Sequence, residues 1–460
     1  MTDASSARAR VADPAELDAF LAANPDVGAV QIMITDPSGV LRGKSVRRAE
    51  LARIYESGRQ VAGSILGLDI TGEDVDETGL VWDTGDADMC ARPLSGTLVR
   101  APWLAAPTGQ LLLTLFDGRG EPAPADPRHA LVRAVDALTR GGLTPVLACE
   151  IEFYLLREEQ GGRLVPAGGG RASERLKIDA YSLQRLDDLA PLFADVYLAA
   201  EAQGLPAETL MSEYAPGQFE ITLRHRADAL RAVDEAVMFK RLLRGVAQKH
   251  GLIACFMAKP FTARAGSGLH LHLSLEDSAK RNVFADEDPA GTPLLRQALA
   301  GMKAHMAESM AIFAPNANSY RRFVSRSYAP IAPNWGINNR SVSLRVPAGP
   351  PSSRHIEHRI AGADANLYLS AACVLAAAAD GIERELDPGP PVEGNGYEQT
   401  GERVLPGSWR RALMVAERSQ FLHDALGAEF MKIFLAIKRQ ECERFLSEVS
   451  ELDYAWYLRT

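Results

Sequence analysis

The 460-residue chain has few cysteines, no long apolar run and no excess of basic residues. Its five cysteines stand far apart without a CxxC pair, which excludes a disulfide framework and a zinc knuckle and favours a reducing compartment. The most apolar run, at 371–379, is too short to span a membrane, and the first residues lack a signal-peptide pattern. A net charge of −9 leaves no basic excess for nucleic acid. We therefore expect a soluble, cytoplasmic protein that binds neither membrane nor nucleic acid.

Glycine-rich phosphate-binding loops are also missing. The chain has no GxxxxGK[ST] motif and no GxGxxG motif that follows a strand-like run. If a nucleotide binds, metal ions and arginines must hold its phosphates.

The hydrophobic pattern predicts a mixed α+β chain without internal repeats. A compact unit is expected over 1–115 and one large α+β domain over 116–460. Capping and stop signals place helices from Asp126-Pro127 to Gly141, over 227–250 and from Thr292-Pro293 onward. The stretch 158–174 is expected to be an exposed loop, and 315–351 a long irregular region.

Four strand-like segments carry polar residues two positions apart, which places both members of a pair on one face. The intervening Ile151, Phe219 and Leu271 would point into a core. A solvated sheet face explains any one pair equally well. Four pairs rich in Glu and His favour a cavity instead. The pairs are Glu150/Glu152, Gln218/Glu220, His270/His272 and Glu357/Arg359.

The four glutamates of these pairs, together with Glu213 and His270, form a set of mainly hard oxygen ligands. Such a set suits Mg²⁺ or Mn²⁺. So many carboxylates would repel one another unless cations neutralise them, and two divalent ions point to phosphoryl chemistry. Arginines crowd the region 318–360, and guanidinium groups bind phosphate and carboxylate in a bidentate manner.

Together the motifs EIEFYLL, SEYAPGQFEI, AGSGLHLHLSL, NSYRRF, NNRSVSLRVP and RHIEHRIAGADANLYL resemble the glutamine synthetase family. Within it, the chain looks most like the γ-glutamylputrescine and γ-glutamylpolyamine synthetases. The resemblance implies a small N-terminal β-grasp domain and a large catalytic domain whose antiparallel sheet forms half a barrel. It also implies ATP, glutamate, two to three Mg²⁺ or Mn²⁺ ions, and a homo-oligomer of two stacked hexamers with sites between subunits.

The resemblance also implies roles for individual positions. Glu152, Glu213 and Glu220 match the ligands of one metal, and Glu150, His270 and Glu357 those of a second, which holds the ATP phosphates. Gly266, Arg322 and Arg359 match groups that bind glutamate. Arg340 and Arg345 match groups around the transferring phosphate, and with Arg322 they are the catalytic candidates. His272, Ser274 and Arg345 belong to the nucleotide side.

The departures from the family pattern concern the second substrate. Ammonium-using members carry an Asp where this chain has Val61, or Ala62 after a one-residue slip, and a flap Glu where it has Tyr328. An apolar wall and a phenol suit a carbon-bearing amine better than ammonium. Two further departures are Ala265 in place of an Asn and His355 in place of a nucleotide-side Arg.

The protein is therefore expected to be an ATP-dependent ligase that joins the glutamate γ-carboxylate to a primary amine. Putrescine or another polyamine is the leading candidate for that amine. Tyr328 or a bound water would take the amine proton. The alternatives are a glutamine synthetase that uses ammonium, a ligase for ethanolamine, methylamine, isopropylamine or aniline, and a non-catalytic ring-forming homologue.

Overall fold

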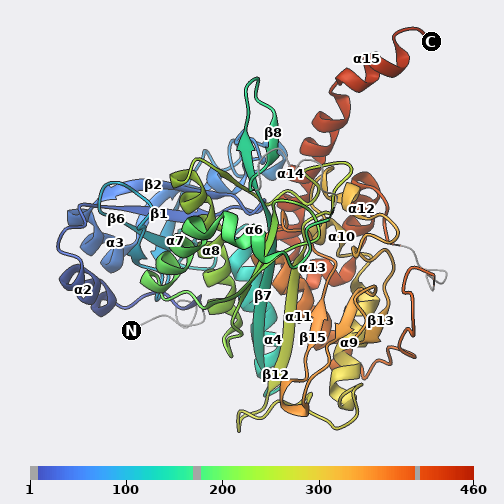
Figure 1. Cartoon of the computed structure of the whole chain (residues 1–460). Coiled ribbons are helices and arrows are strands. Elements are labelled where there is room, and N and C mark those ends of the chain that lie inside the picture. Colours follow the sequence, from blue (N-terminus) through green and yellow to red (C-terminus); the bar gives the residue numbers. More distant parts are fainter. Residues whose placement is uncertain (1–8, 169–177, 399–404) are drawn as a thin grey trace.

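Two sheets organise the molecule in the computed structural model, which describes residues 9–168, 178–398 and 405–460 (Figure 1). The first sheet, drawn in blue, lies at one side of the second, which runs through the centre and is flanked by helices.

The first sheet has the strand order β2-β1-β6-β4-β3, and β5 pairs with β6. The β1–β6 pair is parallel, whereas the other pairs are antiparallel. Its core also receives Ile433 and Ile437 from the far C-terminal end of the chain. The elements of this part are α2 (Pro14–Ala23), β1 (Ala29–Thr35), β2 (Leu41–Arg47), α3 (Leu51–Ser57), β3 (Arg59–Ala62), β4 (Asp88–Pro93), β5 (Val99–Arg100) and β6 (Thr108–Phe116).

The second sheet has the order β13-β14-β15-β12-β7-β10-β9, with β8 and β11 also paired to β7. Every pair is antiparallel except β13–β14. The strands are β7 (Thr144–Glu158), β8 (Leu164–Pro166), β9 (Ala207–Ser212), β10 (Gln218–Leu223), β11 (Ile253–Cys255), β12 (Leu269–Glu276), β13 (Trp335–Ile337), β14 (Leu344–Val346) and β15 (Ile356–His358).

Helices cover one face of the second sheet. Ile151, Phe219 and Leu271 are fully buried there, as predicted, in one core with residues of α4, α8 and α11. The helices are α4 (Pro127–Arg140), α6 (Leu183–Asp188), α7 (Ala190–Ala202), α8 (Ala229–Lys249), α9 (Pro293–His305), α10 (Met310–Phe313), α11 (Leu367–Glu383), α12 (Trp409–Glu417), α13 (Gln420–Leu426), α14 (Ala428–Ser447) and α15 (Glu451–Tyr457).

The predicted helix signals are confirmed. The Asp126 side chain caps α4 by accepting from the Arg128 amide, and Asp228 and Thr292 cap α8 and α9 in the same way. Proline occupies the first position of α4 and α9, where its missing N–H leaves no helical bond unmade.

The prediction of a continuous exposed loop over 158–174 is wrong. Leu164–Pro166 forms β8 and extends β7 into a hairpin, with Val165 buried. Residues 169–174 of that stretch lie outside the described residues. The region 315–351 is mostly irregular, as expected, but holds the short strands β13 and β14.

Figure 1 shows α15 standing away from the body at the end of α14. Tyr454, Trp456 and Leu458 are exposed there. Within the described parts of the chain, no helix combines the length and the apolar character needed to cross a membrane.

Candidate active site

Strand register brings the predicted polar pairs together on the open face of the second sheet. Glu220 on β10 lies directly opposite Glu152 on β7, and His270 on β12 lies opposite Glu150. On the next strand, β15, Glu357 faces His272. Since directly opposed residues share a face, four neighbouring strands contribute to one polar cluster.

Three groups within this cluster could each hold a metal ion. Their ligand atoms lie within 4.8 Å of one another. One group matches a predicted set, Glu152, Glu213 and Glu220. The others are Glu150, Glu220 and His270, and Glu150, His272 and Glu357. His272 therefore stands with the carboxylates, where only a nucleotide-side role was predicted. Its Nε2 lies 3.3 Å from Glu150 Oε2.

The buried carboxylates of the cluster repel one another, and bound cations would relieve that repulsion. Burial raises the pKa of Glu220 to about 12, and the neighbouring carboxylates Glu150 and Glu152 add to the rise. Burial and Glu213 likewise raise the pKa of Glu152. Burial opposes ionisation of Glu150 too, but His270 and His272 hold its pKa well below the usual range. A divalent cation bound by oxygen and imidazole would remove this repulsion, so the donor set fits Mg²⁺ or Mn²⁺.

Glu357 connects the carboxylates to the predicted arginines. Arg345 on β14 lies opposite Glu357 and donates from Nη1 to Glu357 Oε2 at 2.7 Å, while Arg359 donates to Oε1. Burial works against the Glu357 carboxylate, yet Arg359 and the nearby His272 and His270 lower its pKa to about 2. Both guanidinium groups therefore face the cluster as fixed positive charges.

Close backbone contacts shape the opposite side of the cluster. The Gly268 amide donates to Glu152 Oε2 at 2.7 Å, and Gln218 Nε2 donates to the Gly266 carbonyl at 3.0 Å. A Cβ at Gly266 would lie 2.7 Å from Arg322 Cγ, so only glycine fits. Arg322 is buried and donates from Nη1 to the Ile360 carbonyl at 2.8 Å. The predicted glutamate-binding residues Gly266 and Arg322 are thus brought together.

Comparisons with known proteins agree with this geometry. The family model described as "Glutamine synthetase, catalytic domain" matches residues 124–457 of this chain. The chain is 38% identical over 451 residues to the γ-glutamylputrescine synthetase PuuA of Escherichia coli (strain K12), covering 96% of this chain and 94% of that protein. It is 32% identical to a glutamate–isopropylamine ligase of a Pseudomonas species, over 94% and 95% of the two chains. The solved ADP complex of GmaS superposes with a TM-score of 0.84 at 28% identity, over 96% of this chain and 99% of that one.

The chain belongs to the glutamine synthetase family. The predicted fold is confirmed: a curled half-barrel sheet in a mixed α+β chain of the glutamine synthetase type. The protein is accordingly a ligase of this family, whose members use ATP and divalent metals.

The positions that depart from the family pattern lie around the cluster. His355 Nε2 is 3.1 Å from His272 Nδ1, and burial together with His272 lowers the pKa of His355. Ala265 is held through its carbonyl, which accepts from the Tyr154 hydroxyl at 2.7 Å. Ser274 is half-buried on β12, two residues beyond His272.

The remaining predicted residues are more exposed or more distant. Arg340 is exposed and is one of the charges that act on Glu213. Tyr328 is 59% exposed. Val61 and Ala62 lie on β3 in the first sheet, where Val61 packs in the core and Ala62 is half-buried. Val61 and Ala62 therefore belong to the first sheet, whereas Tyr328 lies in the irregular region 315–351, and a common amine pocket stays a prediction.

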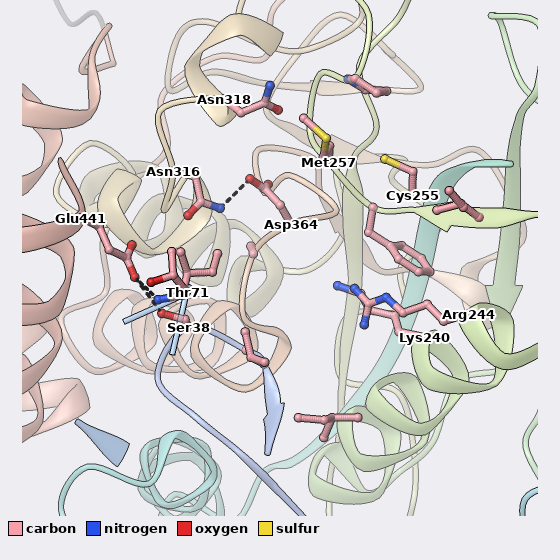
Figure 2. Close-up of a pocket in the computed structure, with 18 of the residues that line it drawn as sticks. Ser38, Thr71, Lys240, Arg244, Cys255, Met257, Asn316, Asn318, Asp364 and Glu441 are labelled. Atoms are coloured by element: carbon pink, nitrogen blue, oxygen red, sulfur yellow. Dashed lines mark hydrogen bonds between the residues drawn. The ribbon is translucent and has the colours of Figure 1, made fainter. Parts of the chain in front are cut away.

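A separate cavity of about 1110 Å³ lies away from these residues and was not predicted (Figure 2). It opens between α8, the turn after β1, the segment 255–260 and the end of α14. Lys240 and Arg244 of α8 line one side, and Asp364, which accepts from Asn316, lies on another. None of the cluster's glutamates or histidines lines it.

Sequence reasoning missed Tyr214 at the edge of the cluster. Its ring centroid lies 6.5 Å from that of Tyr328. The available signal was its position directly after Glu213, inside a motif that already carried two expected ligands.

Proposed function

We propose that the protein uses ATP to join the γ-carboxylate of glutamate to a primary amine. Putrescine or another polyamine is the leading candidate for that amine. The supporting observation is the in-register cluster of Glu and His beside Arg345 and Arg359. Tyr328, whose ring pairs with that of Tyr214 next to Glu213, occupies the position where ammonium-using members carry an acid. The similarity to a γ-glutamylputrescine synthetase points to the same amine class.

The six predicted ligands and His272 would hold two to three Mg²⁺ or Mn²⁺ ions, which would supply charge neutralisation for phosphate oxygens. The chain's own residues do the rest. Gly266, Arg322 and Arg359 hold glutamate. Arg340 and Arg345 stabilise the charge of the phosphoryl group as it passes from ATP to the γ-carboxylate. His272, Ser274 and Arg345 face the nucleotide.

The resulting γ-glutamyl phosphate carries a good leaving group. The neutral amine nitrogen attacks its carbonyl carbon, the C–O bond to phosphate breaks, and the γ-glutamyl amide, ADP and phosphate leave. The alkylammonium must first lose a proton. Tyr328 in its phenolate form, or a bound water that passes the proton on to bulk solvent, takes it.

We further propose a cytoplasmic dodecamer of two stacked hexamers in which β3 of a neighbouring subunit completes the amine pocket. Val61 and Ala62 lie in the first sheet, whereas the cluster of the same chain lies on the second. A neighbouring subunit would supply this apolar wall.

An amine panel tests the proposal. Phosphate release is measured with glutamate, ATP and Mg²⁺ and, in turn, ammonium, methylamine, ethanolamine, isopropylamine, aniline and putrescine. We expect kcat/KM to be highest for putrescine or another polyamine. Equal turnover with ammonium would contradict the assignment from Val61 and Tyr328 and identify a glutamine synthetase.

The panel also separates the remaining alternatives. A maximum at isopropylamine or ethanolamine keeps the ligase and changes the amine. No turnover with any amine would favour a non-catalytic ring-forming protein. Against that alternative, all six predicted metal-ligand positions hold donors.

A further inference from the structure

Two tyrosines stand open to solvent beside the carboxylate cluster. The rings of Tyr214 and Tyr328 have centroids 6.5 Å apart and planes tilted by 56°. Tyr214 is 44% exposed and Tyr328 59%. Tyr214 directly follows Glu213, and its amide donates to Glu213 Oε2 at 3.1 Å. Tyr214 is thus the chain neighbour of a member of the group made by Glu152, Glu213 and Glu220, and Tyr328 is its ring partner.

The backbone on both sides holds this pair in place. The Tyr214 carbonyl accepts from the Asp179 amide at 2.9 Å, and the Glu213 amide donates to the Gln218 carbonyl at 2.8 Å. Tyr328 has φ of +58°, a left-handed conformation that a bulky side chain rarely adopts. The next residue, Ala329, is buried, and its carbonyl accepts from the Tyr397 hydroxyl at 3.1 Å.

The arrangement is not explained by packing of the chain itself. Aromatic rings stabilise a fold when they are buried, whereas these two leave large faces uncovered. A strained backbone that aims one exposed ring toward another is typical of a binding site. Among the described residues, neither phenol hydroxyl has a hydrogen-bond partner.

The chemistry of two tilted phenol rings favours an alkylammonium ion. Their π faces attract a cation within about 6 Å of a ring centroid. The same faces bury methylene groups, each worth about fourfold in affinity when fully covered. Ammonium gains the first interaction but has no methylene to gain the second.

We propose that Tyr214, paired with Tyr328, is a specificity-determining residue that packs against the carbon chain of the amine. The proposal rests on the proposed function and deepens it. It adds Tyr214 to the amine site. It also predicts that the KM for an amine falls as the number of methylenes next to its reacting nitrogen increases. The selected class is a primary alkylamine or diamine rather than ammonium.

The test compares Tyr214→Leu, Tyr328→Leu and the double variant with the wild type. The amines are ammonium, methylamine, propylamine and putrescine, with glutamate and ATP saturating. We expect Tyr214→Leu to raise KM for propylamine and putrescine about tenfold or more, while KM for ammonium changes less than about threefold. Tyr214→Phe, which retains the ring, restores the dependence on chain length.

Two controls separate this effect from damage to the fold. Tyr197→Leu removes a half-buried tyrosine on α7 whose hydroxyl bonds the Glu208 carbonyl, and it should leave the ratio of putrescine to ammonium KM unchanged. KM for glutamate and for ATP should stay constant in every variant.

The outcomes are distinguishable. If the wild type uses amines but Tyr214→Leu keeps the wild-type dependence on chain length, or weakens every amine including ammonium equally, the role of Tyr214 is wrong and the proposed function stands. If the wild type uses only ammonium or no amine at all, both are overturned.

Discussion

At the scale of single residues, the site is a balance between buried carboxylates and the cations beside them. Glu357 is ionised because Arg345 and Arg359 contact both of its oxygens. Among the described residues no Arg or Lys pairs with Glu220, and burial with its acidic neighbours raises its pKa to about 12. The pKa values of the two carboxyls are therefore displaced in opposite directions, although both lie on the same face of the sheet.

Magnesium is expected to stabilise the folded protein through this imbalance. A cation bound only by the native state adds about 2.7 kcal/mol at a concentration one hundred times its Kd. Glu220→Gln removes a donor from two of the three groups and should abolish most of the rise in Tm on adding Mg²⁺. Without metal, the variant should unfold close to the wild-type temperature, because Gln resembles the protonated carboxyl that it replaces.

Thermal unfolding with Mg²⁺ and with EDTA measures both effects. Glu208→Gln, on β9 in an exposed ion pair with Arg224, is the matched control and should retain the full Mg²⁺ response. An undiminished response in Glu220→Gln would show that Glu220 is not a ligand.

At the scale of elements, close helix packing supports the sheet that carries the site. Helices α9 and α11 cross at Gly301 and Gly381, where a Cβ on Gly301 would lie 1.9 Å from the Ala377 carbonyl oxygen. At the end of α9, His305 lies 2.7 Å from Asp380 on α11, contacts Glu308 and stacks on Phe421 of α13 at 3.8 Å. One imidazole thus joins three helices.

The His305 network is expected to make stability depend on pH. Burial disfavours the imidazolium, but Glu308 and Asp380 outweigh it and raise the pKa of His305 above 6.5. Its contribution is therefore complete below pH 6.5 and is lost as pH rises through the folded-state pKa. Arg384, which also bonds Asp380 at 3.0 Å, offsets part of the attraction.

The variant His305→Gln should lower the free energy of unfolding by about 1.5–3 kcal/mol at about pH 5.5, and by less at about pH 9. Thermal unfolding at the two pH values measures the difference. His225→Gln, at an exposed position, should lower stability equally little at both. A larger loss for His305→Gln at the higher pH would contradict the sign.

At the scale of the whole molecule, the C-terminal helix α14 fastens the two sheets to each other. Ile433 and Ile437 enter the core of the first sheet, while Phe430 and Phe434 belong to the core of the second. Further along α14, Glu441 accepts from the Ile70 amide at 2.8 Å. The predicted boundary at 115/116 falls before the last residue of β6, α14 packs on both sides of it, and the division into domains stays a prediction.

The proposed sharing of sites between subunits predicts complementation. Ala62→Arg should block the amine wall that a subunit offers its neighbour, and Glu213→Gln should remove a metal ligand from its own site. Each variant alone should be inactive. Mixed oligomers from co-expression should recover about a quarter of wild-type activity, because random assembly pairs an intact wall with an intact ligand set in one site of four.

Co-purification of separately tagged subunits verifies the mixing. The mass of the assembly from sedimentation should be roughly 600 kDa, twelve times the 49.8 kDa chain. If the mixed oligomers stay inactive, Ala62 and Glu213 act within one chain and the shared site is wrong.

The local patterns of the sequence determined much of this protein. A spacing of two placed Glu150 with Glu152, and His270 with His272, on one face of a strand. The Asp126-Pro127 signal located the start of α4, and apolar residues at helical spacing located α8. These properties depend on neighbours within a few residues, so they can be read along the chain.

Only the tertiary structure decided which faces meet. The register that sets Glu220 against Glu152 and Glu357 against His272 joins strands far apart in sequence, and a slip of one residue would turn each side chain to the helix-covered face. For the same reason, Tyr214 and Tyr328 become neighbours only in the folded chain. The sequence determined which chemical groups were available, and long-range strand pairing decided which of them share a site.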